Sequence, residues 1–202
     1  MKARLTVIYV PGLGDKRVAS QQFAVSMWRL WGVSAMVLPM RWADSEPWDV
    51  KQQRLLSKID EHTLAGKQVA LVGSSAGAAA VINAYTLRKS QLVGCVLIAG
   101  KVNNPNTIGE QYRQANPAFP TCAQACEKSL THLSSADRKR ILSRYALLDL
   151  VVPRKDSMIA GAQNRRLHTI GHGFTIGFQL VCGAPGFLHF LKRLAKTERE
   201  AD

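Results

Sequence analysis

Apolar residues occur along this chain in short continuous runs that glycine, proline or polar residues interrupt. β-Branched and aliphatic side chains dominate these runs, a composition typical of strands covered on both faces of a sheet. The runs predict six strands, at residues 5–10, 34–39, 68–72, 91–99, 144–148 and 166–170.

Between the runs, apolar residues recur at spacings of three and four, as on the inner face of a helix. This pattern predicts helices at residues 20–31, 49–64, 76–88, 135–142, 157–163 and 175–198, the last kinked at residues 183–186. Strands that alternate with helices indicate right-handed crossovers and helices on both sides of a sheet. We therefore expect an α/β fold with a six-stranded, mostly parallel sheet.

Residues 101–134 have only a weak period, and Asn, Pro, Gln and Thr dominate them. Long segments of this kind inside a compact domain are often lids or binding loops. No repeat or linker divides the rest of the chain, and 202 residues can bury a core without disulfide or metal staples. We expect one domain, residues 1–202, that carries a lid-like insert at residues 101–134.

The third predicted strand runs into Gly73-Ser74-Ser75-Ala76-Gly77. Gly-x-Ser-x-Gly between a strand and a helix is the nucleophile-elbow pattern, which exposes a serine hydroxyl at the carboxyl end of a parallel strand. A Cβ two residues before or after the serine would clash with the neighbouring strand or the helix start, which explains both glycines. Ser75 is therefore the candidate nucleophile.

Asp149 and His172 also follow directly after predicted strands. Ligands gather at the carboxyl ends of parallel strands, so we expect these side chains and Ser75 at one edge of the sheet. Their order along the chain, Ser then Asp then His, is the one that the elbow pattern requires. His172 would take the proton of the Ser75 hydroxyl, and Asp149 would hold the other ring nitrogen and stabilise the imidazolium.

A tetrahedral intermediate also needs backbone N–H donors. We assign this oxyanion hole to Ala76, directly after the serine, and to Leu13 in the turn that follows the first predicted strand. The glycines on either side of Leu13 suit a turn that presents its backbone to a ligand.

These motifs together resemble the α/β-hydrolase superfamily, and the resemblance covers nearly the whole chain. Pro11-Gly12-Leu13-Gly14 is similar to the family's His-Gly-x-Gly oxyanion turn, with Pro11 in place of His. Asp149-Leu150-Val151-Val152-Pro153 resembles its acid-bearing Asp-x-x-Val-Pro motif, and Gly171-His172 resembles its base-bearing loop.

The resemblance implies a minimal α/β-hydrolase that starts at the family's third strand. The segment at residues 42–48, with a tryptophan at each end, is similar to the small bacterial serine-hydrolase branch. Two departures stand out. Ser74 replaces the His or Glu often found before the nucleophile, and the insert at residues 101–134 matches no named cap, which leaves the substrate open.

Each assignment has a competitor. Ser74 is a second serine, but at its position in the motif the side chain would point elsewhere. Asp156 competes with Asp149 as the acid, because it also precedes an apolar helical stretch. His168 competes with His172 but lies inside a predicted strand. The tryptophans are expected to pack rather than to bind substrate; they are Trp28, Trp31, Trp42 and Trp48.

Charge affects the expected partners more than the expected fold. Lys and Arg outnumber Asp and Glu 27 to 14, and the resulting net charge of +13 favours anionic substrates or surfaces. The basic residues are scattered, and no nucleic-acid-binding motif surrounds them.

No apolar run is long enough to span a membrane. A basic segment, residues 1–4, precedes the first apolar run, as in a signal peptide, but that run is short and Pro11 ends it. We therefore expect the run to be a strand rather than part of a signal peptide. We also expect a cytoplasmic protein.

The cysteines do not indicate a metal site. Cys122 and Cys126 have a spacing that matches no common zinc signature. Cys95 and Cys182 lie in apolar runs, as expected of small core residues. We expect neither a metal nor an organic cofactor.

The sequence therefore predicts a serine hydrolase that cleaves a carboxylic ester, or else a thioester or amide, through an acyl-enzyme on Ser75. An alternative is a catalytically inactive protein of the same fold whose basic surface binds an anionic partner. A dinucleotide-binding domain fits less well, because Arg17 stands where the third glycine of that motif belongs.

Overall fold

The strands form one six-stranded parallel sheet. The computed structural model describes residues 5–15 and 18–201. The basic segment at residues 1–4 and Arg17 therefore lie outside the described residues, as do Lys16 and Asp202. The strands are β1 (Thr6–Val10), β2 (Ser34–Val37), β3 (Val69–Ser74), β4 (Leu92–Ile98), β5 (Ile141–Leu148) and β6 (Gln163–Ile170). They are arranged in the order β2-β1-β3-β4-β5-β6, and each neighbouring pair is parallel. The predicted α/β class and the six-stranded sheet are confirmed.

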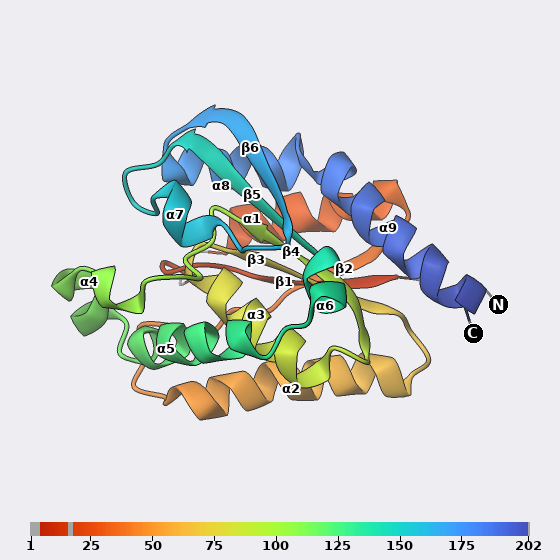
Figure 1. Ribbon diagram of the computed structural model, residues 1–202, viewed down its shortest axis with the longest axis horizontal. Coiled ribbons are helices and arrows are strands. Elements are labelled where there is room, and N and C mark those ends of the chain that lie inside the picture. Colours follow the sequence, from red (N-terminus) through yellow and green to blue (C-terminus); the bar gives the residue numbers. More distant parts are fainter. Residues whose placement is uncertain (1–4, 16–17, 202) are drawn as a thin grey trace.

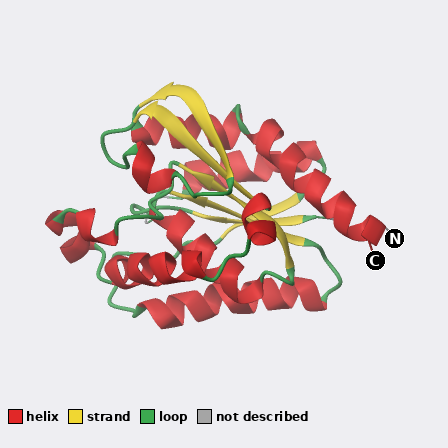
Figure 2. Cartoon of the chain, viewed as in Figure 1, coloured by secondary structure: helices red, strands yellow, loops and turns green. Residues whose placement is uncertain are grey.

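Helices cover both faces of the sheet, as Figure 2 shows. They are α1 (Ala19–Ser26), α2 (Trp48–Leu64), α3 (Ala76–Arg88), α4 (Glu110–Ala115), α5 (Ala118–Thr131), α6 (Ser135–Lys139), α7 (Arg154–Ser157), α8 (His172–Val181) and α9 (Ala184–Ala201), with the 3-10 turns η1 (Met27–Trp31) and η2 (Pro105–Thr107). Helices α1, α8 and α9 lie over one face and α2, α3 and α5 over the other, whereas α4 projects at one end (Figure 1).

The two faces of the sheet have separate apolar cores. Successive side chains of a strand point to opposite faces, so β1 contributes Tyr9 to one core and Ile8 to the other. On the α1 side, the Trp28 ring packs edge-on against Tyr9 and Phe187. On the α2 side, the buried rings of Trp42 and Trp48 stack with their centroids 6.1 Å apart. Three of the four tryptophans therefore pack in the core, and only Trp31 is substantially exposed.

Residues 101–134 are more helical than their weak period predicts. Helix α5 packs against α3 and buries Phe119, Cys122, Cys126 and Leu130. These residues are three or four apart and therefore form one helix face. In contrast, the short helix α4 buries no residue. The insert thus combines a core helix with an exposed segment, and whether it works as a lid stays a prediction.

Two helix predictions around β5 are wrong, one in its end and one in its existence. The helix expected at residues 135–142 ends at Lys139, and β5 begins at Ile141, which pairs with Cys95 of β4. The helix expected at residues 157–163 is absent. Instead, α7 begins right after Pro153, and the side chain of Asn164 binds the backbone of Ile159, which replaces helical hydrogen bonds there.

The terminal helix predicted at residues 175–198 is two helices. Helix α8 starts at His172, and the chain breaks after Val181 before α9 begins. Among the described helices, none is by itself long and apolar enough to cross a membrane; α8 and α9 reach that length and hydropathy only as a pair bent by 62°.

Candidate active site

Ser75 lies at the turn from β3 into α3 and has a φ of 51°, in the left-handed region that most residues avoid. Backbone hydrogen bonds hold it there: its N–H donates to the Ile98 carbonyl at 3.0 Å, and its own carbonyl accepts from the N–H of Lys101 at 3.0 Å. A Cβ on Gly73 would lie 2.6 Å from the carbonyl oxygen of Gly77, and one on Gly77 would overlap the carbonyl of Val10. Both flanking glycines are therefore required by close backbone approach.

The structure brings Ser75, His172 and Asp149 into one chain of hydrogen bonds. The Oγ of Ser75 lies 2.9 Å from Nε2 of His172, and Nδ1 of His172 lies 2.7 Å from Oδ2 of Asp149. The three residues follow the carboxyl ends of β3, β6 and β5, which meet at one edge of the sheet. Gly171, with a φ of 91°, makes the turn from β6 that places His172 at the start of α8.

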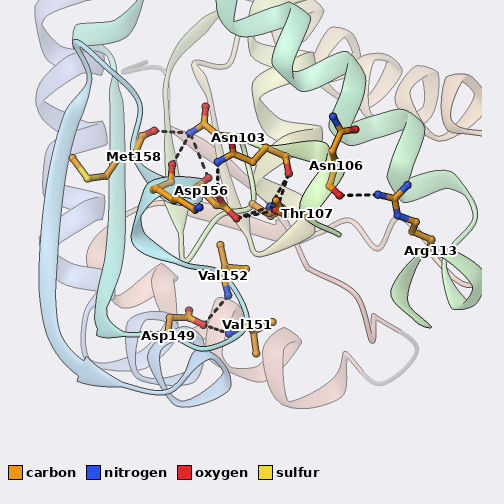
Figure 3. A network of polar contacts seen from close by, with 12 residues as sticks. Asn103, Asn106, Thr107, Arg113, Asp149, Val151, Val152, Asp156 and Met158 are labelled. Carbon is orange, nitrogen blue, oxygen red and sulfur yellow. Dashed lines mark hydrogen bonds and ion pairs between the residues drawn. The ribbon is translucent and has the colours of Figure 1, made fainter. Parts of the chain in front are cut away.

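Asp149 is fixed by its own loop. Its Oδ1 accepts hydrogen bonds from the backbone N–H groups of Val151 and Val152, both at 2.9 Å (Figure 3). Burial alone would raise the pKa of the carboxyl, but the hydrogen bonds from His172, Val152 and Val151 outweigh burial and hold this pKa below its usual range. The carboxylate therefore stays ionised at neutral pH while Oδ2 faces the imidazole.

The competing residues occupy other places. The hydroxyl of Ser74 lies 2.7 Å from that of the buried Tyr9, which in turn donates to the side chain of Gln21 at 2.9 Å. Asp156 is buried in an ion pair with Lys101, at 2.5 Å. His168 lies in β6 and is exposed. The hydrogen bonds of the described residues include none between Ser75 and either Asp156 or His168.

The two residues assigned to the oxyanion hole border Ser75. Ala76 follows it as the first residue of α3, so its N–H has no acceptor within the helix. Leu13 lines both cavities that contain Ser75. The turn before Leu13 approaches the nucleophile closely, since a Cβ on Gly12 would lie 2.6 Å from the Cβ of Ser75.

Two cavities meet at Ser75. The first, the insert-side cavity of about 300 Å³, lies against the 101–119 segment and is lined by Ile108, Phe119 and Val152, among others. The second, the α8-side cavity of about 510 Å³, lies between α1 and α8 and contains His172. Tyr112 lines both cavities. A third cavity of about 740 Å³, around Asp15, Arg41 and Arg54, is not lined by Ser75 or His172.

Lys101, Tyr112 and Gln21 line this site, although the sequence did not single them out. Lys101 could have been found, because it comes two residues after the predicted fourth strand ends and so belongs to the same sheet edge. Tyr112 and Gln21 gave no such signal. Their roles depend on how α4 and α1 pack beside Ser75.

Of the two cysteines expected in the core, Cys95 is buried as expected and Cys182 is not. Cys95, Cys122 and Cys126 are buried, but Cys182 is exposed at the break between α8 and α9, so its expected core position is wrong. No group of three or more His, Cys, Asp or Glu side chains could hold a metal ion in the part of the chain that the structure describes.

No protein-family model matches the chain, and no curated protein matches its sequence. Solved structures do resemble it. A carboxylesterase structure from the thaumarchaeon Nitrososphaera gargenis superposes with a TM-score of 0.72 at 10% identity, covering 95% of this chain and 92% of that one. Est1E from Butyrivibrio proteoclasticus gives 0.65 at 13% identity, with 95% and 89% covered.

A structure from a study of the metagenome-derived lipolytic enzymes LipS and LipT gives a TM-score of 0.64 at 12% identity, with 98% of this chain and 94% of that one covered. Other similar structures are described as α/β hydrolases. At these identities the likeness concerns the fold, and the chain has the α/β-hydrolase fold.

Proposed function

We propose that this chain of α/β-hydrolase fold is a serine hydrolase that cleaves carboxylic esters through an acyl-enzyme on Ser75. The observation that carries the proposal is the continuous hydrogen-bond chain from Ser75 Oγ through His172 to Asp149. The carboxylesterase and lipolytic neighbours support the ester as the bond that is cleaved.

In the first step, Ser75 Oγ attacks the ester carbonyl carbon while Nε2 of His172 takes the hydroxyl proton. Asp149, held by two backbone N–H groups, fixes the ring so that Nε2 faces the serine, and it stabilises the imidazolium that forms. The carbonyl π bond opens, and the negative charge moves onto its oxygen. The N–H groups of Leu13 and Ala76 donate to this oxyanion.

In the second step, the intermediate collapses and the C–O bond to the alcohol breaks. His172 gives its proton to the departing alkoxide, which leaves as the free alcohol. Water then enters, His172 takes one of its protons, and hydroxide attacks the acyl carbon of the ester formed with Ser75. The second tetrahedral intermediate then collapses: the bond between the acyl carbon and Ser75 Oγ breaks, the acid leaves, and the proton on His172 returns to Oγ.

The cavities suggest how an ester would lie. The insert-side cavity has an apolar wall made by Ile108, Phe119 and Val152, which suits the acyl chain. The α8-side cavity contains His172, the group that must protonate the leaving alcohol, so we assign the alcohol to this side. The insert-side volume of about 300 Å³ favours short or medium acyl chains.

A fluorophosphonate probe tests the nucleophile. Ser75→Ala should abolish labelling of the purified protein, because the probe bonds only to an activated serine Oγ. Ser74→Ala is the matched control, since Ser74 is the adjacent serine and binds Tyr9 instead of His172. It should keep its labelling.

Labelling of Ser75→Ala at the wild-type level would contradict the proposal. If the wild type reacts neither with the probe nor with short-chain p-nitrophenyl esters, the alternative of an inactive binding protein is favoured.

A further inference from the structure

Helices α1 and α8 carry an apolar outer face that nothing in the described part of the chain covers. Neither helix contains a Lys, Arg, Asp or Glu, although a fifth of the chain's residues are charged. Their buried residues face the sheet, and large apolar side chains point the other way into solvent. With η1, which continues α1, these side chains form the α1–α8 face: Phe23, Met27, Leu30, Phe174, Phe178 and Val181.

The two halves of this face are neighbours. Helix α1 packs beside α8 (Figure 1). The indole Nε1 of Trp28 donates to the Leu180 carbonyl at 2.9 Å. The rings of Phe174 and Phe178 stack with their centroids 6.0 Å apart. Phe23 is 71% exposed and Phe174 64% exposed, so these aromatic rings meet water rather than protein. A contiguous apolar surface of this kind typically marks an interaction site.

This face borders the route to Ser75. The α8-side cavity lies between α1 and α8 and contains both Ser75 and His172. The loop after Asp149 extends the apolar rim, because Leu150 is 88% exposed and its neighbour Val151 lines the same cavity. A surface that covered the α1–α8 face would therefore lie at the mouth of the candidate site.

The described segments that build the face contain basic but no acidic residues. Residues 18–40 and 157–197, which contain α1, η1, α8 and most of α9, include no Asp or Glu but six Lys or Arg. Exposed Arg29 lies in η1 next to Leu30, and the exposed Lys192 donates through Nζ to the Trp31 carbonyl at 3.2 Å. Basic groups thus flank the apolar side chains, a combination that favours anionic lipid.

We propose that the α1–α8 face docks on an anionic lipid–water interface. The apolar side chains would enter the boundary between headgroups and acyl chains, while Arg29 and Lys192 would contact lipid phosphates. A second copy of the chain fits less well, because a two-fold contact through this face would bring like charges together. The consequence for catalysis, that an acyl ester reaches Ser75 directly from the interface, rests on the proposed function.

Vesicle co-sedimentation tests the docking without any turnover. Vesicles of pure phosphatidylcholine are compared with vesicles that contain phosphatidylglycerol as well, using the full chain. The wild type and Ser75→Ala should both sediment with the anionic vesicles, and added salt should weaken the binding. The double variant Phe23→Ser/Phe178→Ser should bind at least about tenfold more weakly, since it removes two of the apolar anchors.

Leu64→Ser is the matched control. Leu64 is 88% exposed, but it lies on α2, across the sheet from the α1–α8 face, so its loss should leave vesicle binding unchanged. Neither Phe23 nor Phe178 lines the cavities at Ser75, so the double variant should hydrolyse a soluble short-chain ester at the wild-type rate. Circular dichroism confirms that the variants fold.

Three results would overturn the docking proposal: no sedimentation of the wild type with either vesicle, equal sedimentation of the wild type and the double variant, or a dimer in solution that the double variant dissociates. Failure of the proposed function is a separate result, namely absence of fluorophosphonate labelling, and it leaves the vesicle experiment unaffected.

Discussion

At the scale of single residues, the site depends on one unfavourable backbone conformation. A φ of 51° at a serine costs conformational energy, which persists only where the surroundings hold it. Here the amide and carbonyl of Ser75 are both bonded, and the flanking glycines admit the neighbouring backbone. The strained backbone at Ser75 thus lowers the stability of the folded chain, and it directs the Ser75 hydroxyl toward His172.

Gly77→Ala should be costly for this reason. The new methyl would overlap the Val10 carbonyl, and we expect a loss of about 1–3 kcal/mol in the free energy of unfolding, with esterase activity reduced. Urea denaturation measures the change. Gly177→Ala is the control, because a Cβ there meets nothing within 4 Å and Ala favours the helix α8. An equal loss in the free energy of unfolding for Gly77→Ala and Gly177→Ala would contradict the argument that the Val10 backbone leaves no room for a Cβ at Gly77.

Asp149→Asn should keep the fold and lose turnover. The amide can no longer stabilise the imidazolium or fix the tautomer, so we expect kcat on a short-chain ester to fall by about three to four orders of magnitude. The KM should change little, because Asp149 does not line either cavity at Ser75. A kcat within tenfold of the wild type would assign the acid role elsewhere.

The same variant should show how stability depends on pH. The pKa of Asp149 is lowered below its ordinary value of 3.8, so ionised Asp149 stabilises the folded chain above that pH, and the contribution is lost as the pH falls through the lowered pKa. Urea denaturation should therefore show a constant stability difference between wild type and Asp149→Asn near neutral pH. The difference should shrink in acid.

At the scale of elements, a buried ion pair joins the segment after β4 to α7. Lys101 donates to Asp156, to the Asn104 carbonyl at 3.0 Å and to the Thr107 hydroxyl at 2.6 Å. Asn103 adds a bond to the Met158 carbonyl at 2.7 Å (Figure 3). Because Lys101 and Thr107 also line the insert-side cavity, this network sets one wall of the site.

Removing one partner of this pair should destabilise the chain more than removing both. Asp156→Leu or Lys101→Met alone leaves a buried charge without its counter-ion, at an expected cost of about 3–5 kcal/mol. The double variant Lys101→Met/Asp156→Leu should recover part of that loss. Urea denaturation of the three variants provides the comparison, and strictly additive losses would show that the pair is not coupled.

At the scale of the whole molecule, the sheet divides the interior into two cores and leaves one thiol outside them. Burial raises the pKa values of the Cys95, Cys122 and Cys126 thiols, whereas Cys182 is exposed. The native protein should therefore react rapidly with Ellman's reagent at one thiol, and three more should react on unfolding. Cys182→Ser should remove the rapid phase. Rapid reaction of more than one thiol would mean that a core opens readily.

The sequence by itself determined the sheet and the residues of the candidate triad. A strand buried on both faces requires a continuous apolar run, and a turn with no room for a Cβ requires glycines on both sides of the serine. Both features can therefore be predicted from a short stretch of sequence. Ser75, Asp149 and His172 each follow such a run, and parallel strands bring their carboxyl ends to one edge.

Only the tertiary structure decided the rest. The face of α5 that contains Cys122 and Cys126 is buried because α3 lies opposite it, and neighbouring prolines weakened the helical signal in the sequence. The sequence favoured Asp149 as the acid but left Asp156 as a competitor, and folding separates them because it places His172 beside Asp149 and Lys101 beside Asp156. The cavities and the α1–α8 face are likewise properties of packing between distant segments, which no local pattern encodes.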